Sequence, residues 1–334
     1  MRTLIAGLGS IGRRHLRNLL ALGEEDIVLL RSGRGTLPDD ELAGFPVETD
    51  IQLALKNRQP DAVIVSNPTA FHMDIAIPAA AAGCSLLLEK PISHDLKRIE
   101  ELKQAVHQGG GQVLVGFQFR FHPGMKKAQD LLAQETLGKP LYVRVHWGEY
   151  LPDWHPWEDY RDSYSARKDL GGGVVLTLCH PLDYLRMLFG EVESVNADLR
   201  SGRLAGLDVE DTAEILLDFE NDVLGSVHLD YVQRPASHTL EVTTENGRIK
   251  WDNADGSVSW IEAGKDTWQQ WTPPQQFERN TLFLDEMKNF LDVVNGTEQP
   301  ACSLDDGIRS LEIALASQRS DHQGCRVFLR EMRT

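Results

Sequence analysis

Three glycines near the start of the chain limit its possible folds more than any other feature. Residues 3–6 are an apolar run typical of a short buried strand, Gly7-Leu8-Gly9-Ser10-Ile11-Gly12 follows at once, and helical spacing continues from Arg13 to Leu22. In such a strand–turn–helix the first glycine allows a tight turn, the second lets backbone approach a diphosphate, and the third lets helix pack on strand. A purely structural turn is the alternative. The context favours a dinucleotide site on the turn formed by Gly7, Gly9, Ser10, Ile11 and Gly12.

The overall composition disfavours several classes of partner. With 334 residues the chain exceeds the size at which one hydrophobic core usually divides, so two domains are expected. Hydrophobic residues make up 41% and charged residues 25%, as in ordinary soluble proteins, and no apolar run is long enough to span a membrane. The net charge of −16 disfavours nucleic acid, because most of the surface would repel a phosphate backbone.

The cysteines and the first residues indicate the cellular compartment. Cys84, Cys179, Cys302 and Cys325 have neither metal-ligand nor redox spacing, so no metal site is expected. The first strand begins almost at the first residue, which leaves no room for a signal peptide. Both features predict a reducing, cytoplasmic environment.

Strand and helix patterns alternate through the first 120 residues. Such alternation predicts a parallel sheet with helices on both faces, so we expect an N-terminal Rossmann dinucleotide-binding domain over residues 1–120. Gly109-Gly110-Gly111 is a strong helix stop before the last strand. The expected strands are 3–6, 26–31, 62–66, 85–88 and 112–116, and the expected helices are 13–22, 51–56, 71–82 and 96–108.

After Pro123 the pattern changes. Residues 121–334 are predicted to form a substrate-binding and oligomerisation domain of the α+β type, with a large, mostly antiparallel sheet open on one face. Asn246-Gly247 is a strong hairpin signal within it. Because an open face usually needs a cover, a homodimer or homotetramer through this face is expected. The expected strands are 141–150, 192–199, 211–219, 222–231, 238–245 and 248–251, and the expected helices are 174–188, 281–294 and 304–318.

The end of the second strand bears on the choice of nicotinamide cofactor. In this fingerprint an acidic residue about 20 positions after the glycines usually binds the ribose 2′-hydroxyl and selects NAD. Here the strand tip carries Arg31, Ser32 and Arg34 and no carboxylate. A guanidinium and a hydroxyl suit a 2′-phosphate, whereas the alternative is a pair of solvated arginines in a turn. The sequence therefore predicts NADP as the preferred cofactor, with NAD possible.

Two more strand ends carry polar residues. Asn67-Pro68-Thr69 followed by His72 ends one predicted strand, and Glu89-Lys90-Pro91 ends the next. Doubly wound folds bind their ligands at the carboxyl ends of strands. By itself Glu-Lys-Pro is a charged pair before a proline, so its meaning depends on the remaining motifs.

Taken together, the motifs resemble those of the glucose–fructose oxidoreductase, inositol dehydrogenase and MocA family, written Gfo/Idh/MocA. They span most of the first 190 residues in the family's order. The resemblance implies a pyridine-nucleotide oxidoreductase that acts on a secondary alcohol or ketone of a sugar, sugar acid or cyclitol. Besides the glycine turn, the matching elements are Asn67-Pro68-Thr69-Ala70-Phe71-His72, Ala82-Gly83, Glu89-Lys90-Pro91, Val115-Gly116-Phe117 with Arg120, and Gly171-Gly172-Gly173 leading to His180 and Asp183.

The resemblance also implies roles for single residues. Lys90 matches the family's catalytic lysine, whose ammonium stabilises a developing alkoxide, and His180 matches a second catalytic position that exchanges the hydroxyl proton. Without the triple glycine, His180 would be interpreted as structural. Beyond the turn and the strand tip, the expected cofactor contacts are Asn67, Pro68, His72, Glu89, Lys90 and Gln118. The expected substrate contacts are Lys90, Arg120, Trp157, Tyr160, Tyr164, Arg167, Thr177, His180 and Asp183.

One position departs from the family pattern. Many relatives have an aspartate about one helical turn before the histidine, where this chain has Leu176 and Thr177. Thr177 offers a hydroxyl only. Asp183 follows His180 by three residues and can orient the ring if the segment is helical; contact with solvent or with Arg186 is the alternative.

Residues 147–168 hold six of the chain's thirteen tryptophans and tyrosines. Aromatic faces suit the C–H faces of sugar rings, and the cations of this segment suit a substrate carboxylate or phosphate. The alternative is a lid whose aromatic rings pack and whose cations pair with Asp159, Asp162 and Asp169. The aromatic residues are Trp147, Tyr150, Trp154, Trp157, Tyr160 and Tyr164, and the cations are His155, Arg161, Arg167 and Lys168.

Two other functions compete with a sugar dehydrogenase. A catalytically silent sensor would keep the dinucleotide fold and report ligand to a partner protein. The presence of Lys90 and His180 argues against a sensor, and Thr177 argues weakly for one. The other possibility is a reductase of a non-sugar carbonyl or diol.

Overall fold

The structure is a computed structural model that describes residues 1–33 and 37–332. The chain forms two compact units, the first made of residues 1–118, 169–171 and 279–308, and the second of the remainder. The predicted boundary after residue 120 lies within two residues of the first division, whereas residues 279–308, which the sequence assigned to the second domain, belong to the first unit. Among the described residues, no helix combines the length and apolar character needed to cross a bilayer.

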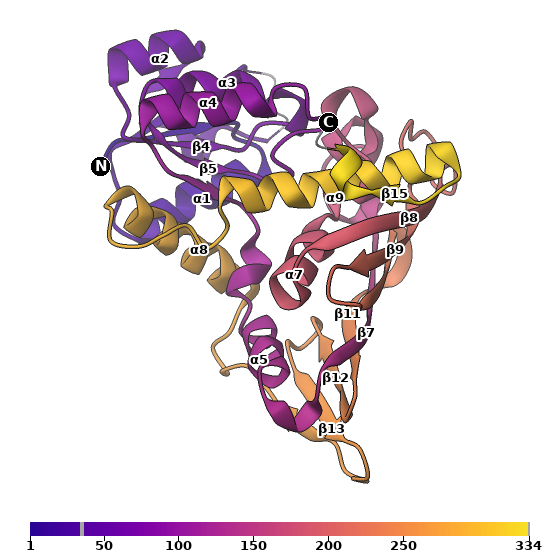
Figure 1. Cartoon of the computed structure of the whole chain (residues 1–334). Helices are drawn as coiled ribbons and strands as arrows, with labels where there is room; N and C mark the ends of the chain where they lie inside the picture. The colour runs from indigo at the N-terminus through magenta and orange to yellow at the C-terminus, as the bar shows by residue number, and fades with distance from the viewer. Residues whose placement is uncertain (34–36, 333–334) are drawn as a thin grey trace. The chain divides into compact units, whose positions relative to one another are not determined.

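A six-stranded parallel sheet forms the centre of the first unit (Figure 1). Its strand order, β3-β2-β1-β4-β5-β6, is that of a dinucleotide-binding Rossmann fold, so this prediction is confirmed. The five longer strands are buried throughout, because their apolar runs are covered by helices. The strands are β1 (Thr3–Ala6), β2 (Ile27–Leu30), β3 (Val47–Glu48), β4 (Ala62–Val65), β5 (Ser85–Leu88) and β6 (Val113–Val115).

A late helix completes the first unit by packing on its first helix. In this contact the Arg14 guanidinium lies 4.4 Å from the centroid of the Phe283 ring, and Asn280 Nδ2 donates to Asn18 Oδ1 at 2.9 Å. These side chains explain why residues 279–308 return to the first unit. The helices are α1 (Ser10–Ala21), α2 (Ile51–Arg58), α3 (His72–Ala81), α4 (Ile99–Gly109) and α8 (Arg279–Val294).

The second unit is built on a nine-stranded sheet of order β14-β13-β12-β11-β7-β10-β9-β8-β15. All neighbouring strands are antiparallel except β7 and β10, which confirms the predicted mostly antiparallel sheet. The strands are β7 (Pro140–Tyr150), β8 (Val192–Arg200), β9 (Thr212–Phe219), β10 (Leu224–Asp230), β11 (Val232–Thr244), β12 (Gly247–Asp252), β13 (Val258–Glu262), β14 (Gln269–Trp271) and β15 (Val327–Phe328).

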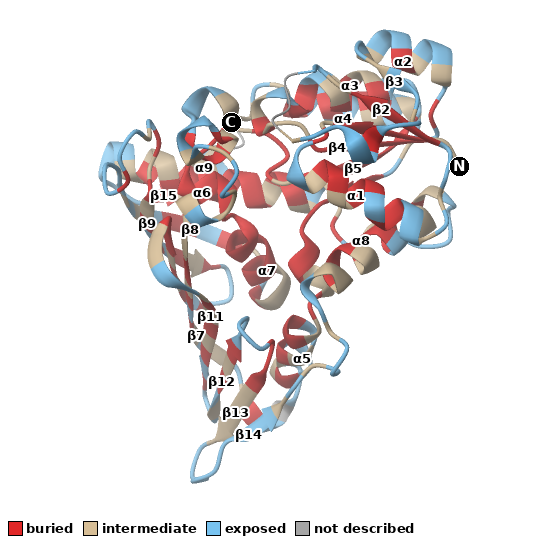
Figure 2. Cartoon of the chain, turned by 180° about the vertical axis from the view of Figure 1, so that it is seen from behind, coloured by how far each residue is buried: buried red, intermediate tan, exposed pale blue. Residues whose placement is uncertain are grey.

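The two faces of this sheet differ in burial (Figure 2). Residues such as Val145 and Val227 are fully buried on one face, and α5 and α6 contact the sheet. The other face exposes more than half of the side chains of Leu216 and Leu224. The helices of the unit are α5 (Pro123–Leu132), α6 (Val174–Thr177), α7 (His180–Phe189) and the part of α9 (Leu304–Gln323) that follows Ile308.

One local difference from the sequence prediction concerns residues 174–188. The sequence predicted one helix there, but α6 ends at Thr177 and α7 begins at His180. Pro181 lies in the first turn of α7 and has no backbone N–H, so it starts a helix and cannot continue one. The helix α5 was not predicted from the sequence. Pro123 begins it, and the His122 side chain caps it by accepting from the amide of Gly124.

Candidate active site

The glycine turn connects β1 to α1 and packs against the end of β4. Gly7 has a φ of +90°, and a Cβ there would lie 2.4 Å from the backbone nitrogen of Asn67. A Cβ on Gly12 would lie 1.9 Å from the carbonyl oxygen of Gly7. Around Gly9, by contrast, no atom of the described residues comes within 4 Å of an added Cβ. Two glycines are therefore required by packing, and the middle one leaves open space above the turn.

The first turn of α1 presents backbone amides to that space. Gly9 is the N-cap residue, and no side chain caps the helix among the described residues. The amides of Ser10 and Ile11 thus stand at a positive helix end. Amides at a helix N-terminus and an open approach fit the diphosphate of a pyridine dinucleotide.

The tip of β2 differs from the sequence expectation in one respect. Arg31 Nη2 donates to Asp39 Oδ1 at 2.6 Å, so a carboxylate from further along the chain does reach this strand tip. The Arg31 guanidinium lowers the pKa of Asp39 below its ordinary value. Ser32 is the second residue after β2, and the predicted contact Arg34 lies outside the described residues.

Asn67 lies just beyond β4, and His72 fixes its backbone. His72 Nε2 is 2.9 Å from the Asn67 carbonyl oxygen, and Asn67 Nδ2 donates to the carbonyl of Phe71 at 3.0 Å. Burial lowers the pKa of His72, so the ring is neutral near neutral pH. Asn67 Oδ1 is buried with no hydrogen-bond partner among the described residues, which makes it available to a ligand amide or hydroxyl. Pro68 then begins the turn into α3.

The end of β5 carries a buried carboxylate next to Lys90. Glu89 Oε1 lies 2.9 Å from His15 Nε2, and Glu89 Oε2 accepts from the Lys90 amide at 3.1 Å. Burial by itself raises the pKa of Glu89, but the hydrogen bond and charge of His15 and the charge of Lys90 lower it below its ordinary value. Glu89 therefore remains ionised, and its carboxylate hydrogen-bonds His15 and the Lys90 amide.

A second buried carboxyl group belongs to the same cluster. Glu286 of α8 is fully buried, and neither of its side-chain oxygens has a hydrogen-bond partner among the described residues. Burial, together with the negative charge of Glu89, raises the pKa of Glu286 well above its ordinary value, although Lys90 opposes this. Sequence reasoning missed both His15 and Glu286; the available signal was a carboxylate on the apolar face formed by Leu282, Phe283, Met287 and Phe290.

His180 of the second unit lies in an aromatic cluster. Its ring meets Phe119 edge-on with centroids 5.0 Å apart, and it lies 5.7 Å from Trp147. Trp147 stacks in turn on His238 at 4.2 Å. Trp147 therefore belongs to the packed face of the sheet, as the alternative interpretation of the aromatic segment proposed.

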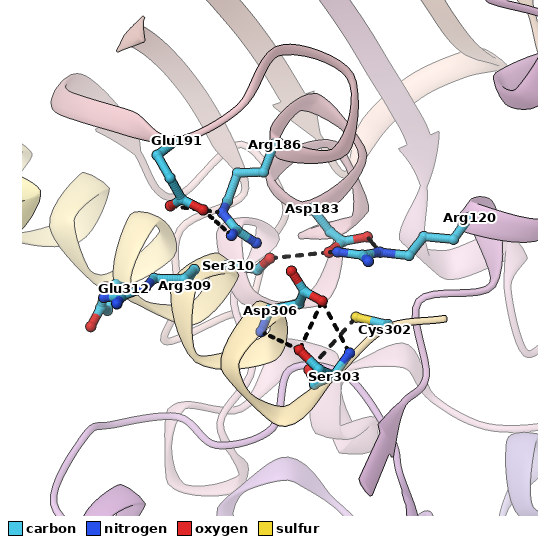
Figure 3. A network of polar contacts seen from close by, with 10 residues as sticks. All are labelled: Arg120, Asp183, Arg186, Glu191, Cys302, Ser303, Asp306, Arg309, Ser310 and Glu312. Carbon is cyan, nitrogen blue, oxygen red and sulfur yellow. Dashed lines mark hydrogen bonds and ion pairs between the residues drawn. The ribbon is translucent and has the colours of Figure 1, made fainter. Parts of the chain in front are cut away.

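Asp183, on the next turn of α7, is held by an arginine and a serine (Figure 3). Arg120 donates to both carboxylate oxygens, Nε to Oδ2 at 2.8 Å and Nη2 to Oδ1 at 2.7 Å, and Ser310 Oγ lies 3.3 Å from Oδ1. Arg186, which the sequence offered as a partner of Asp183, forms an ion pair with Glu191. The structure thus joins two predicted substrate contacts, Arg120 and Asp183, to each other.

The remaining predicted substrate contacts lie in α6 and in short turns of the second unit. Thr177 is a buried residue of α6. Tyr160 donates its hydroxyl to the carbonyl of Ala205 at 2.7 Å. Trp157 is 55% exposed. Tyr164 is half-buried, Arg167 is exposed, and Gln118 is a buried residue of the first unit.

The cations of this segment are partly used by its own carboxylates. Arg161 pairs with Asp159 at 2.9 Å and His155 with Glu158 at 3.0 Å. The pairing of Arg161 with Asp159 agrees with the lid interpretation. The Trp157 side chain, in contrast, is exposed to solvent.

Comparison with known proteins places the chain in a family. Residues 1–117 match the model "Oxidoreductase family, NAD-binding Rossmann fold", and residues 125–250 match "GFO/IDH/MocA C-terminal domain". The chain is 27% identical over 348 residues to myo-inositol 2-dehydrogenase of Thermotoga maritima, with 99% of each chain covered. It is 22% identical over 336 residues to D-xylose 1-dehydrogenase (NADP(+)) 2 of Haloferax volcanii, with 97% of this chain and 98% of the relative covered.

A solved structure extends this agreement to the whole fold. Levoglucosan dehydrogenase, in complex with NADH and levoglucosan, superposes with a TM-score of 0.86 at 20% identity, covering 98% of this chain and 99% of the other. The family models together match more than half of the chain, and the parallel sheet, the glycine turn and the mixed sheet agree with them. The chain belongs to the GFO/IDH/MocA oxidoreductase family.

Proposed function

We propose that this protein is an NAD(P)-dependent oxidoreductase that transfers a hydride between nicotinamide and a secondary alcohol or ketone of a sugar, sugar acid or cyclitol. The observation that carries the proposal is Lys90 at the carboxyl end of β5, beside the buried Glu89–His15 pair and in the same unit as the glycine turn. Family membership supports the class of reaction. The names of the two relatives, an inositol dehydrogenase and a xylose dehydrogenase, support the class of substrate.

In this proposal each catalytic residue has one task. A bound oxidised nicotinamide supplies the hydride acceptor. Lys90 donates a hydrogen bond to the substrate oxygen and stabilises its negative charge as the O–H bond breaks. Neutral His180 accepts that proton, while the electron pair of the C–H bond leaves as hydride and the carbonyl forms. In the reductive direction the imidazolium returns the proton to the oxygen.

The supporting residues prepare the site for this chemistry. Glu89 accepts from the Lys90 amide, which fixes the backbone that carries the ammonium. Asn67 has a free, buried Oδ1 and a backbone held by His72, so we propose it as a contact of the cofactor. Arg120 and Asp183 are fixed by their mutual ion pair, and we propose that they orient substrate hydroxyls.

We further propose that NADP is preferred over NAD. Arg31 and Ser32 follow β2, where the adenosine ribose of a dinucleotide binds. In this proposal Asp39 orients the Arg31 guanidinium toward a 2′-phosphate. The competing arrangement is direct acceptance of the ribose 2′-hydroxyl by Asp39, which would favour NAD.

We also propose that a second copy of the chain covers the exposed sheet face of the second unit. Leu216 and Leu224 are 56% and 54% exposed on adjacent strands there. Light scattering of the wild type should give the mass of a dimer or tetramer. The variant Leu216→Glu should shift that mass toward the monomer, and a monomeric wild type would exclude the proposed assembly.

The experiment that tests the function is an assay of purified protein with sugars, sugar acids and cyclitols, each with NAD and NADP, followed by nicotinamide absorbance. Turnover of at least one polyol that disappears in Lys90→Met is the expected result. Tight cofactor binding with no turnover of any compound, in both reaction directions, would contradict it and favour the sensor. Turnover restricted to non-sugar diols or carbonyls would overturn the proposed substrate class.

A further inference from the structure

A row of polar side chains crosses the exposed face of the sheet in the second unit. Strand pairing places Glu214 of β9 opposite His228 of β10, and His228 opposite His146 of β7. Two residues along, Asp230 lies opposite Gly148. Because side chains two positions apart on a strand share a face, the two histidines and Asp230 project on the same side of the sheet.

The ring nitrogens and the carboxylate are close enough to bind one ion. One candidate ligand atom each from His146, His228 and Asp230 lies within 4.8 Å of the others. His228 Nε2 is 2.9 Å from Asp230 Oδ2, and the two imidazole rings stack with centroids 4.7 Å apart. Gly148 gives the carboxylate its room, because a Cβ there would lie 2.3 Å from Asp230 Oδ2.

Each histidine has a hydrogen-bond partner outside the three candidate ligands. His228 Nδ1 lies 2.6 Å from Glu214 Oε1, which leaves Nε2 on the side of Asp230. His146 Nε2 lies 2.5 Å from Gln233 Oε1. The Gln233 amide nitrogen donates to the carbonyl of Pro235, so Oε1 is the acceptor and Nε2 of His146 carries the proton. The lone pair of His146 is therefore on Nδ1.

Asp230 is fixed in the same way. Its Oδ1 accepts from the amides of Val232 and Gln233 at 2.8 and 2.7 Å, and its side chain is 4% exposed. Oδ2 alone is directed to the imidazoles. In His228 and Asp230 the polar atom that does not face the cluster is held by hydrogen bonds. Such bonds orient metal ligands in proteins.

We propose that His146, His228 and Asp230 bind one divalent transition-metal ion, with zinc the best match. Two imidazole nitrogens and one carboxylate oxygen make a ligand set that Zn²⁺ accepts, with a fourth position for water. The ion replaces the proton between His228 and Asp230. In the single chain a groove of about 450 Å³, lined by Glu214, His228 and Asp230 among others, lies on this face.

The site has a structural consequence that is independent of the proposed oxidoreductase function. His146 and His228 come from β7 and β10, the parallel pair at the centre of the sheet. An ion bound by both strands links them directly and stabilises the folded second unit. Cysteine spacing predicted no metal site, and it could not reveal these ligands, because they are histidines and an aspartate from distant parts of the chain.

The test is a titration of the chelator-treated full chain with Zn²⁺ alone, by calorimetry. We expect one ion per chain, and visible absorption bands of tetrahedral Co²⁺ when cobalt replaces zinc. His146→Gln and His228→Gln should each weaken binding by about tenfold or more. His107→Gln and His322→Gln, which change exposed histidines on α4 and α9, should bind like the wild type.

Two further variants separate binding from folding. Glu214→Gln keeps the fold and the three ligands but weakens the support of His228, so its affinity for zinc should fall by about tenfold. Circular dichroism without metal checks the fold of each variant, and both histidines are half-buried rather than core residues. Absence of stoichiometric zinc binding in the wild type, or unchanged affinity in the double variant His146→Gln/His228→Gln, would overturn the proposal.

Discussion

Arg120 and Asp183 form a two-armed ion pair in which the arginine side chain is 10% exposed and the aspartate side chain 2%. The planar guanidinium matches both carboxylate oxygens, a geometry that lysine cannot reproduce. The pair connects η3 (Gln118–Phe121) to α7, the helix that His180 begins. It therefore fixes the helix that carries a proposed catalytic residue.

Breaking this pair from one side should be costly. Asp183→Asn leaves the Arg120 charge buried without its counter-ion, so we expect a loss of about 3–5 kcal/mol in the free energy of unfolding. Urea denaturation followed by circular dichroism measures it. The double variant Arg120→Met/Asp183→Leu removes both charges and should lose less than the sum of the single variants. Additive losses would show that the two side chains do not interact energetically.

Lys90 can be tested apart from cofactor binding. Lys90→Met keeps the length of the side chain but removes the ammonium, so kcat should fall by about 10²–10³-fold or more. Cofactor affinity, measured by fluorescence quenching, should change little. Lys97→Met is the matched control, because this lysine is 84% exposed and should be replaceable at full activity. Equal activity of Lys90→Met and wild type would remove Lys90 from the mechanism.

Arg31 decides the proposed preference for NADP. Arg31→Asp removes a charge-assisted bond to the 2′-phosphate and adds repulsion, so KM for NADP should rise about tenfold or more while KM for NAD changes less. Asp39→Asn is the informative partner variant. If Asp39 itself binds a ribose hydroxyl, Asp39→Asn will weaken the binding of NAD more than the binding of NADP. That result would contradict the proposed preference for NADP.

The neutral state of Glu286 predicts a pH-dependent effect on stability. The pKa of Glu286 is raised in the folded state, so its proton stabilises the protein fully below the unfolded pKa, and this contribution is lost as pH rises toward the folded pKa. Glu286→Gln mimics the protonated group, so its melting temperature should match that of the wild type near pH 4 and exceed it near pH 8. A pH-independent difference between the two proteins would contradict a raised pKa.

His122 predicts the opposite pH trend. Burial lowers its pKa to about 4, so the unfolded chain binds the proton more strongly. Stability is then fully present above the unfolded pKa of about 6.5 and is lost as pH falls toward 4, by about 2 kcal/mol between pH 7.5 and pH 5. His122→Asn keeps an acceptor for the amide of Gly124 and should flatten this slope in urea titrations. The exposed control His107→Asn should leave the slope unchanged.

The sequence was a reliable guide where a few neighbouring residues decide the structure. The glycine turn depends on local backbone freedom, and the buried strands depend on continuous apolar runs. The interruption between α6 and α7 was missed, although Pro181 was visible, because the apolar spacing continues through it. The apolar pattern thus predicted helix in this region but not the position at which one helix ends and the next begins.

The sequence by itself determined the Rossmann sheet, the phosphate-binding turn and the family motifs, since these rest on residues close together in the chain. Only the tertiary structure decided the partners of the charged groups. Asp39 reaches Arg31, Glu286 joins Glu89, and His228 meets His146 and Asp230 on one sheet face. The physical reason is that electrostatic and metal-ligand contacts depend on distance in space, which packing sets among residues far apart in sequence.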